Sequence, residues 1–580
     1  MKKNNTAGYI FLCSLVFVLI IISFTIFKLV PYEGFNPSDE GVIAAQSFRL
    51  MHGEVPHKDF ISIRPAGSGY LHIIDFLFPI PFIEAGRWFT IFEYFIYAAI
   101  WLFLMITAIN NSRLIRDFPV RITACILIAF CLTIQIKHIF PWTTVDAIFF
   151  TSIGFLSYFR SIDFSTFRLI KPAAAFWGIL LMSIAALCRQ TFIFPVCVSG
   201  LTILIAGFRS KKLFSALLTG IAGCLPVVSY LIYLNAHAAF NDFIDQMTGR
   251  TELFHTGIFE YGVHLFYTPW VILYACFTLV LVLLKIDKNG TLKNLLYFDL
   301  ITFLIIAGSG FAMFFTSTQK TIPFVFFWTT LYLTIRLIFC KMPGKIIFIS
   351  LAGLLLSWTG SISLGDNSPL FCSGILLTII VSQLFVLYEM PLTHFFKNND
   401  KLFKTSLPVI SILILSFTIY SEGQFNYRDL SRNNLTEALN NFFPEMGDVH
   451  TNKNTYAYFG ELMRLKNELH IPLNDLVVLP NNAAIYPLLN SRNPFPVDWA
   501  QCNEYIGAEE KMNADIRSAL SHKDIVILVD KIDSKYMFDG FEPFKPDLAF
   551  NHAYLPLITN SSLCKKMDLN SPYFDVYIPN

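Results

Sequence analysis

Long apolar segments alternate with short polar connections through the first 421 residues of this 580-residue chain. A helix needs about 17–25 residues to cross the hydrocarbon core of a bilayer, so segments of this length predict membrane spans. The chain is therefore predicted to be a polytopic α-helical membrane protein. About thirteen spans are expected, at residues 8–30, 88–110, 120–137, 143–160, 172–188, 191–208, 212–235, 267–285, 295–315, 321–340, 345–363, 368–389 and 405–421.

Basic residues gather in alternate connections, and the other connections carry few of them. Because cytoplasmic loops are enriched in Lys and Arg, this asymmetry predicts a cytoplasmic N-terminus. An odd number of spans then places the C-terminal region on the outer side of the membrane. The first apolar segment has no small-x-small cleavage pattern after it, so it is expected to remain as a span. The clusters include Lys2/Lys3, Arg113/Arg116/Arg121, Arg209/Lys211/Lys212 and Lys397/Lys401/Lys404.

The composition narrows the class of protein further. The mean hydropathy is +0.55, and only 14% of residues are charged, which excludes an ordinary soluble protein. The net charge of +2 comes with no basic block interleaved with aromatics, so nucleic-acid binding is not predicted. Most of the cysteines lie singly within apolar segments, where they are expected to be core residues. Cys502 and Cys564 lie in a polar region and would be able to pair in an oxidising compartment.

A change in composition after Tyr420 predicts two domains, a membrane domain at 1–421 and a soluble α/β domain at 422–580. Helical periodicity appears at 430–442, 456–469 and 510–520, and strand-like runs at 475–479, 524–529 and 574–578. No dinucleotide-binding, P-loop or nucleophile-elbow motif occurs there, so this domain is not expected to perform catalysis.

The first connection on the predicted outer side, residues 31–87, is long and rich in charge. Ser38 is a suitable N-cap, Asp39 and Glu40 complement a helix N-terminus, and Gly53 is a plausible stop. A second short helix is predicted to begin at Pro65 and to run to Pro79. Both helices are expected to lie along the membrane surface.

Several residues of this loop together resemble a known family. Asp39 and Glu40 are followed by Gly53, Pro56, Asp59 and Phe60, and then by Pro65 and Tyr70. This order resembles the membrane-embedded glycosyltransferases of the GT-C class, with the protein O-mannosyltransferases and aminoarabinose lipid A transferases as the nearest group. The sequence departs from their pattern at His57, where Tyr is common, and at Ala66, where Gly is common.

The resemblance implies a GT-C fold and an inverting transfer of a sugar from a polyprenyl-phosphate, such as undecaprenyl phosphate, to an acceptor on the periplasmic side of a bacterial inner membrane. Lipid A, an O-antigen or another surface glycan is the expected acceptor. Such a reaction needs a carboxylate to accept a proton and a cation to stabilise the departing phosphate. Asp39 takes the leading acidic position and is the expected base, with Glu40 as the alternative. Asp59 is expected to contact the acceptor or to cap a turn.

Cations on the outer side are the candidates for binding the lipid phosphate. Arg189, beside Gln190, interrupts two apolar segments, where a guanidinium would grip phosphate through two hydrogen bonds. The full predicted set of substrate-binding residues is Asp59, Arg64, His57, Lys58, Tyr70, Arg189, Gln190, Arg250 and Lys320.

No metal site is predicted, because His52, His57 and His72 lack the spacing and partners of a zinc set. A divalent ion stays open, since some members of the wider GT-C class need one, but the nearer group that the chain resembles implies none. Two other functions remain open at this stage. A lipid-linked glycan flippase or other transporter would place its polar residues at mid-membrane, often in repeated halves. An O-antigen ligase or polymerase would carry its large outer loop between late spans.

Overall fold

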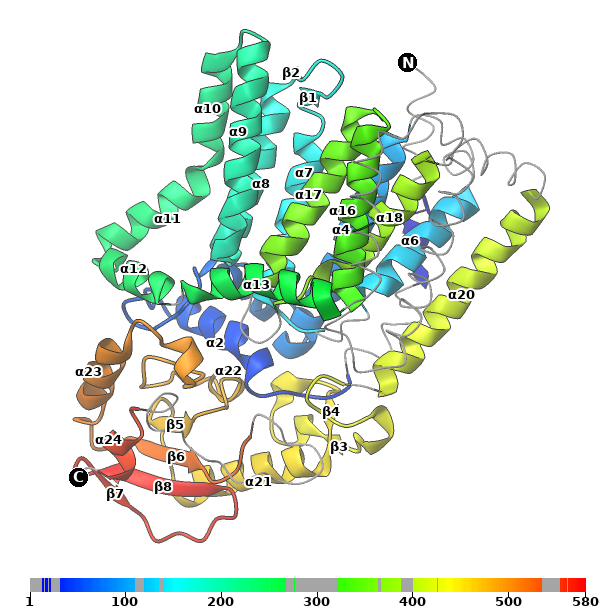
Figure 1. The fold of residues 1–580 in the computed structure, drawn as a ribbon. Helices are drawn as coiled ribbons and strands as arrows, with labels where there is room; N and C mark the ends of the chain where they lie inside the picture. The colour runs from blue at the N-terminus through cyan, green and yellow to red at the C-terminus, as the bar shows by residue number, and fades with distance from the viewer. Residues whose placement is uncertain are drawn as a thin grey trace.

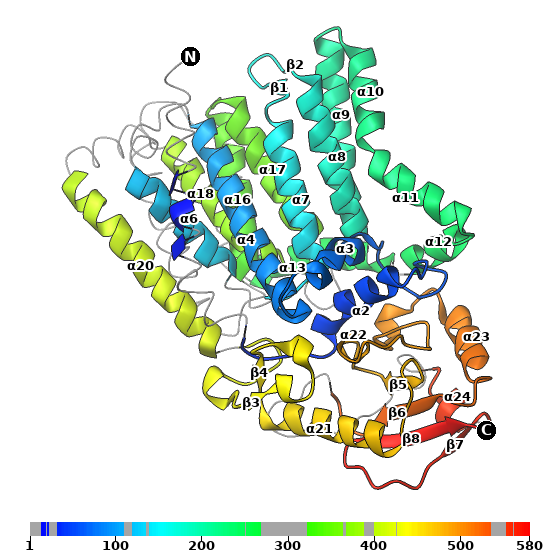
Figure 2. The same cartoon turned by 180° about the vertical axis from the view of Figure 1, so that it is seen from behind.

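The computed structural model describes residues 32–109, 119–134, 139–249, 251–267, 322–362, 367–387, 400–424, 426–534 and 553–580 except 561, with a few residues between 13 and 21 and Cys276. The predicted spans at 8–30, 267–285 and 295–315 fall wholly or largely outside these residues. Two parts are seen in Figures 1 and 2, a bundle of long helices and a smaller C-terminal part that covers one end of it.

The bundle consists of apolar helices that match the predicted segments closely. Among the described residues, five helical segments are long and apolar enough to cross a membrane, and the bent pair α10 and α11, inclined by 47°, adds a sixth if it is one span. The described helices of the bundle are α4 (Phe82–Ala108), α6 (Pro119–Ile134), α7 (Thr143–Tyr158), α8 (Pro172–Cys188), α9 (Ile193–Arg209), α10 (Leu213–Gly223), α11 (Leu225–Ala236), α16 (Ile322–Phe339), α17 (Gly344–Ser361), α18 (Ser373–Leu387) and α20 (Asp400–Gln424).

Helix α4 begins at Phe82, six residues before the predicted start at residue 88. The added turns contain Glu84 and Arg87, whose charges argued against a span in the sequence. Both side chains are buried, because they bind residues outside the bundle: Glu84 accepts a hydrogen bond from the Asp448 amide and Arg87 pairs with Glu40.

The C-terminal part is built on a four-stranded sheet with the order β5-β6-β8-β7. β5 (Leu476–Leu479) and β6 (Val526–Asp530) are parallel, whereas β8 (Phe574–Pro579) is antiparallel to β6 and β7 (Cys564–Lys566). Alternate side chains of the strands pack on α21 (Lys453–Glu468) on one face and on α23 (Glu509–Ala519) on the other. The three predicted strands and the helices at 456–469 and 510–520 are confirmed as elements.

One predicted helix of this part is wrong, and three short strands, β3 (Glu437–Ala438), β4 (His450–Thr451) and β7, were not predicted. Residues 430–442 form the turns η4 (Arg432–Asn434) and η5 (Leu439–Asn441) around the strand β3. β3 pairs with β4, and this tertiary pairing overrides the helical spacing of the apolar residues. The short strand β7 carries Cys564, which is a free cysteine; the side chain of Cys502 lies outside the described part.

Helix α2 (Asp39–Met51) lies between the bundle and the C-terminal part (Figure 1). All of its residues except Met51 are buried. That α2 lies along the membrane surface stays a prediction; the structure shows that the C-terminal part covers one of its sides. At Gly41, a Cβ would lie 2.1 Å from the backbone nitrogen of Ala484, so only glycine permits this close approach. The second predicted helix forms as two short pieces, α3 (Gly67–Leu71) and the 3-10 helix η1 (His72–Leu77).

Candidate functional site

The acidic pair occupies the first turn of α2, at the junction of the bundle and the C-terminal part. The predicted cap at Ser38 is wrong in its detail. Asn36 Oδ1 accepts the hydrogen bond from the Asp39 amide at 2.8 Å, and the Ser38 hydroxyl donates to the same oxygen at 2.8 Å. The carboxamide thus satisfies a free N–H group of the first turn, as an N-cap residue would.

Asp39 and Glu40 point to different partners, as expected for successive residues that diverge by about 100° around a helix. Asp39 Oδ2 accepts a hydrogen bond from the Tyr427 hydroxyl at 2.9 Å and forms an ion pair with Arg428, both from the C-terminal part. Glu40 instead accepts two hydrogen bonds from Arg87 of α4, at 2.6 and 2.9 Å. Asp39 therefore faces the C-terminal part, while Glu40 joins α2 to the bundle.

Arg189 is buried at the junction of α8 and the 3-10 helix η2 (Gln190–Phe192). Its guanidinium donates to the Thr144 hydroxyl and to the Ile362 carbonyl. Within the described part of the chain, no carboxylate forms an ion pair with it. Burial, and to a smaller extent the charge of Arg64, lowers the pKa of Arg189 to about 9, so the side chain is still charged at neutral pH. A buried guanidinium without a carboxylate partner favours the approach of an anion.

Arg64 and Gln190 lie near Arg189 but are already engaged. Arg64 forms a two-pronged ion pair with Glu504, at 2.9 and 3.1 Å. The Gln190 side-chain nitrogen donates to the Ile63 carbonyl at 2.9 Å, which joins η2 to the first loop. The oxygen of the same carboxamide is buried and has no hydrogen-bond partner. The Gln190 side chain thus keeps an unused polar atom, while both terminal nitrogens of Arg64 bind Glu504.

The segment between α6 and α7 connects the surroundings of Asp39 and Arg189. The Phe140 ring contacts Tyr427, the hydrogen-bond partner of Asp39, with ring centroids 5.5 Å apart. Four residues further on, Thr144 accepts the hydrogen bond from Arg189. The candidate phosphate ligand thus contacts this segment directly, at Thr144, and the candidate base is linked to it through Tyr427 and Phe140.

His57 is completely buried in a left-handed backbone conformation (φ 71°). Its Nδ1 lies 2.8 Å from Gln246 Oε1, and its Nε2 lies 2.9 Å from the Tyr230 hydroxyl. Burial lowers the pKa of His57 to about 4, so the ring is neutral at physiological pH. These contacts fasten the first loop to α11 and to α12 (Phe240–Thr248), and they leave no ring nitrogen for a substrate.

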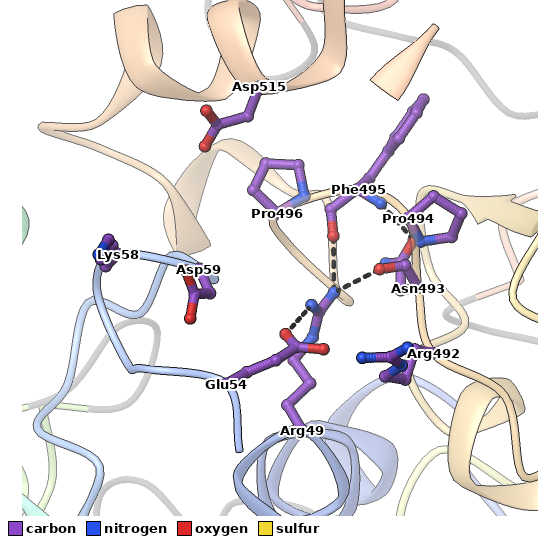
Figure 3. Close-up of a pocket in the computed structure, with 10 residues that line it drawn as sticks. All are labelled: Arg49, Glu54, Lys58, Asp59, Arg492, Asn493, Pro494, Phe495, Pro496 and Asp515. Carbon is purple, nitrogen blue, oxygen red and sulfur yellow. Dashed lines mark hydrogen bonds and ion pairs between the residues drawn. The ribbon is translucent and has the colours of Figure 1, made fainter. Parts of the chain in front are cut away.

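Lys58 and Asp59 are exposed at the mouth of a pocket of about 390 Å³ between the first loop and the C-terminal part (Figure 3). Asp59 also accepts a hydrogen bond from the Val55 amide at 2.7 Å, so it closes a turn as well. The pocket is lined by Arg49, Glu54, Lys58, Asp59, Arg492, Asn493, Pro494, Phe495, Pro496 and Asp515. It is polar, and its charges come from both parts of the molecule.

At the centre of this pocket, Arg49 from the last turn of α2 is buried and holds the two parts together. Its guanidinium contacts Asp498 through two hydrogen bonds of 2.8 Å, Glu54 at 2.7 Å and the Phe495 carbonyl at 2.6 Å. Each of the three guanidinium nitrogens therefore has a hydrogen-bond partner within the protein. Arg49 therefore joins α2 to the C-terminal part, whereas Lys58 and Arg492 have exposed charges at the rim of the pocket.

The remaining predicted residues do not join these groups. Tyr70 is 42% exposed, and burial of its ring together with the neighbouring Tyr233 raises the pKa of its hydroxyl. Arg250 and Lys320 lie outside the described residues.

Sequence reasoning missed the ionic partners of the acidic pair, Arg87, Tyr427 and Arg428. Arg87 gave one signal, since it is a cation next to the start of a predicted span. Tyr427 and Arg428 lie 388 or more residues from Asp39, in a stretch without any motif. Only the folded chain brings them to the first turn of α2.

Of known protein families, curated proteins and solved structures, only solved structures are similar to this chain. The sequence matches no protein-family model and no curated protein. The structure is similar to that of ArnT from Cupriavidus metallidurans bound to undecaprenyl phosphate, with 11% identity and a TM-score of 0.46 over 97% of each chain. The apo ArnT structure gives 11% identity and a TM-score of 0.41 over the same shares. ArnT is an aminoarabinose lipid A transferase, the group that the first loop resembles. At 11% identity, a function has to be argued from the side chains of this chain.

Proposed function

We propose that this protein is an inverting glycosyltransferase that moves a sugar from a polyprenyl-phosphate donor to an extended glycan or glycolipid acceptor. The observation that carries the proposal is that residues 140–144 link the two groups: Thr144 accepts a hydrogen bond from Arg189, and Phe140 contacts Tyr427, the hydrogen-bond partner of Asp39. A carboxylate that accepts a proton and a cation that receives a phosphate are the two groups that a direct displacement requires.

In the proposed reaction, an acceptor hydroxyl replaces the Tyr427 hydroxyl as the hydrogen-bond donor to Asp39. The acceptor oxygen attacks the anomeric carbon of the sugar while its proton passes to the Asp39 carboxylate. The bond between that carbon and the phosphate oxygen breaks, and the polyprenyl phosphate departs with the electron pair. Arg189, which has no carboxylate partner among the described residues, stabilises the charge on the departing phosphate.

We place a polar portion of the acceptor in the pocket beside Lys58, Asp59 and Arg492. Asp39 and Arg49 are ten residues apart on α2, which corresponds to about 15 Å along the helix axis. An acceptor that reaches both the pocket and Asp39 must therefore be extended, as an O-antigen, lipid A or another surface glycan is. The same proposal puts the bundle in a bacterial inner membrane, with about thirteen spans and the C-terminal part, residues 422–580, on the periplasmic side.

The test is sugar transfer in membranes that contain the full-length protein, with radiolabelled polyprenyl-phosphate sugars as donors. Wild-type membranes should release labelled glycan that depends on the acceptor, and Asp39→Asn membranes should not. Labelled lipid that crosses the bilayer without sugar transfer would indicate a flippase instead. Transfer of a whole preassembled glycan from a diphosphate lipid would indicate a ligase or polymerase. Either result would overturn the proposal.

A further inference from the structure

Four ionisable side chains meet beneath the first loop, away from the residues assigned to substrate. His72 and Asp75 come from η1, Glu93 from the third turn of α4, and Asp146 from the first turn of α7. Each of the four side chains is at most 5% exposed. Three carboxylates at such a site would repel one another unless protons, a charged imidazole or a bound cation compensate their charge.

The donor atoms of three of these residues converge. One ligand atom each of His72, Glu93 and Asp146 can be chosen so that all lie within 4.8 Å of one another. His72 Nε2 and Asp146 Oδ1 are 3.3 Å apart. Ligands at about 2.0–2.2 Å from a tetrahedral metal ion are roughly 3.3–3.6 Å apart, so this pair already has the separation that a shared ion requires.

The carboxylate of Glu93 lacks any other explanation in the fold. It is completely buried, and neither of its oxygens has a hydrogen-bond partner; Asp146 Oδ2 has none either. Buried polar atoms are nearly always paired, and leaving a carboxylate unpaired is costly. A bound cation would satisfy all three oxygens at once.

His72 is also oriented as a metal ligand usually is. Its Nδ1 contacts Asp75 Oδ2 at 2.8 Å, which leaves Nε2 directed at Asp146. A carboxylate on the far ring nitrogen fixes the tautomer and increases the basicity of the ligating nitrogen in many zinc sites. Asp75 thus supplies the supporting hydrogen bond and the other three residues supply the ligands.

We propose that His72, Glu93 and Asp146 bind a divalent transition-metal ion, with Zn²⁺ as the best fit to one imidazole and two carboxylates. The ion fastens η1 to α4 and α7, and so fixes the first loop on the bundle. Asp146 is two residues from Thr144, the hydrogen-bond partner of Arg189. The metal site therefore also stabilises the segment that the candidate base and phosphate ligand share. Sequence analysis did not predict this site, because the ligands come from three separate segments.

The experiment measures metal content and thermal stability, so it does not depend on sugar transfer. Full-length protein is purified in detergent, freed of any histidine tag, treated with EDTA and reloaded with Zn²⁺ or Mn²⁺. Inductively coupled plasma mass spectrometry should find a stoichiometric ion that raises the melting temperature. Glu93→Gln should lose the ion, whereas Asp530→Asn, which removes another buried carboxylate, should retain it.

A second variant protects the test against a failure of Glu93→Gln to fold. Asp75→Asn keeps all three ligands but weakens the orientation of His72, and it should lower the Zn²⁺ affinity roughly 10- to 100-fold. The proposal is overturned if reloaded wild-type protein holds no stoichiometric metal. It is equally overturned if Glu93→Gln or Asp75→Asn binds Zn²⁺ as tightly as the wild type, since the cluster would then be a proton-sharing network without an ion.

Discussion

Arg87 holds both carboxylate oxygens of Glu40, with Nε to Oε1 at 2.6 Å and Nη2 to Oε2 at 2.9 Å. The same guanidinium donates to the Gly34 carbonyl at 2.6 Å, so it also fixes the chain that enters α2. Both side chains are buried. Glu40 is thus occupied by a structural partner, and the adjacent Asp39 is left to meet the C-terminal part.

The two acidic residues should therefore respond differently to loss of charge. Asp39→Asn should lower the transfer rate about 10²- to 10⁴-fold, the usual contribution of a general base, with little change in melting temperature. Glu40→Gln should destabilise the fold by about 3–5 kcal/mol, because Arg87 would remain buried without its anion. Rates are measured with labelled donor in membranes, and stability by thermal unfolding in detergent. Asp524→Asn, at an exposed position, is the control. Normal transfer by Asp39→Asn would remove it as the base.

Replacement of Arg189 should weaken donor binding. Hydrogen bonds to a charged group contribute about 1.5–3 kcal/mol, so Arg189→Gln should raise the KM for the lipid donor roughly 10- to 150-fold. The donor KM of Arg189→Lys should lie between those of the wild type and Arg189→Gln, since lysine keeps the positive charge but loses the two-nitrogen geometry of the guanidinium. The measurement is the dependence of transfer on donor concentration. Arg168→Gln, at an exposed position of a short strand, should leave the KM unchanged. An unchanged KM in Arg189→Gln would exclude it as the phosphate ligand.

The ion pair of Arg49 and Asp498 should be strongly coupled. Arg49→Met leaves Asp498 buried without its cation and should cost about 3–5 kcal/mol of unfolding free energy. The double variant Arg49→Met/Asp498→Leu should lose less than the sum of the single variants, because both charges are removed together. Unfolding in detergent measures the three variants against the wild type. Strict additivity would show that the contact contributes nothing to the union of the two parts.

His57 should make the protein less stable in acid. Its pKa falls from 6.5 to about 4 on folding, so the unfolded chain binds more protons than the folded chain between these values. The contribution of His57 to the free energy of unfolding should be fully present above pH 6.5 and should be lost as the pH drops towards 4. The full loss corresponds to roughly 3 kcal/mol at 1.36 kcal/mol per pKa unit. His57→Gln should show a flatter profile over this window in pH-dependent thermal unfolding. His522→Gln, at an exposed position, should keep the slope.

The pocket of Figure 3 should affect the acceptor and not the donor. Lys58 and Arg492 present exposed charges at its rim, so Lys58→Gln and Arg492→Gln should raise the KM for acceptor glycan several-fold. Each exposed contact is worth about 0.2–1 kcal/mol, and the two together about twice that. Kinetics with acceptor varied at saturating donor measure the effect. A change confined to the donor KM would assign the pocket to the lipid phosphate instead.

Much of the fold was predictable because its signals are local. The helices α7, α8 and α17 begin and end within about three residues of the predicted spans, a margin typical of boundaries read from sequence. The three long strands were visible as short apolar runs. The helix predicted at 430–442 failed because the pairing of β3 with β4, a tertiary contact, decides its conformation. The start of α4 was missed because Arg87 is neutralised by a residue 47 positions away.

Of the candidate site, the sequence predicted the residues that have local signals but not their distant partners. The acidic pair and Arg189 have local signals, a motif and an interrupted apolar segment. Their environments depend on residues far along the chain, such as Tyr427 for Asp39 and Ile362 for Arg189. The cluster of His72, Glu93 and Asp146 depends on the register between η1, α4 and α7, which no single segment encodes.

The position of α2 between the two parts has a consequence for synthesis. Its acidic turn leaves the ribosome early, yet Asp39 meets Tyr427 only 388 residues later, and Arg49 meets Asp498 only 449 residues later. Until then the helix has no cover on one side, and Asp39 and Arg49 lack these partners. The surroundings of α2 are therefore complete only after residue 498 has been synthesised, and a nascent chain released before that point would leave one side of the helix uncovered.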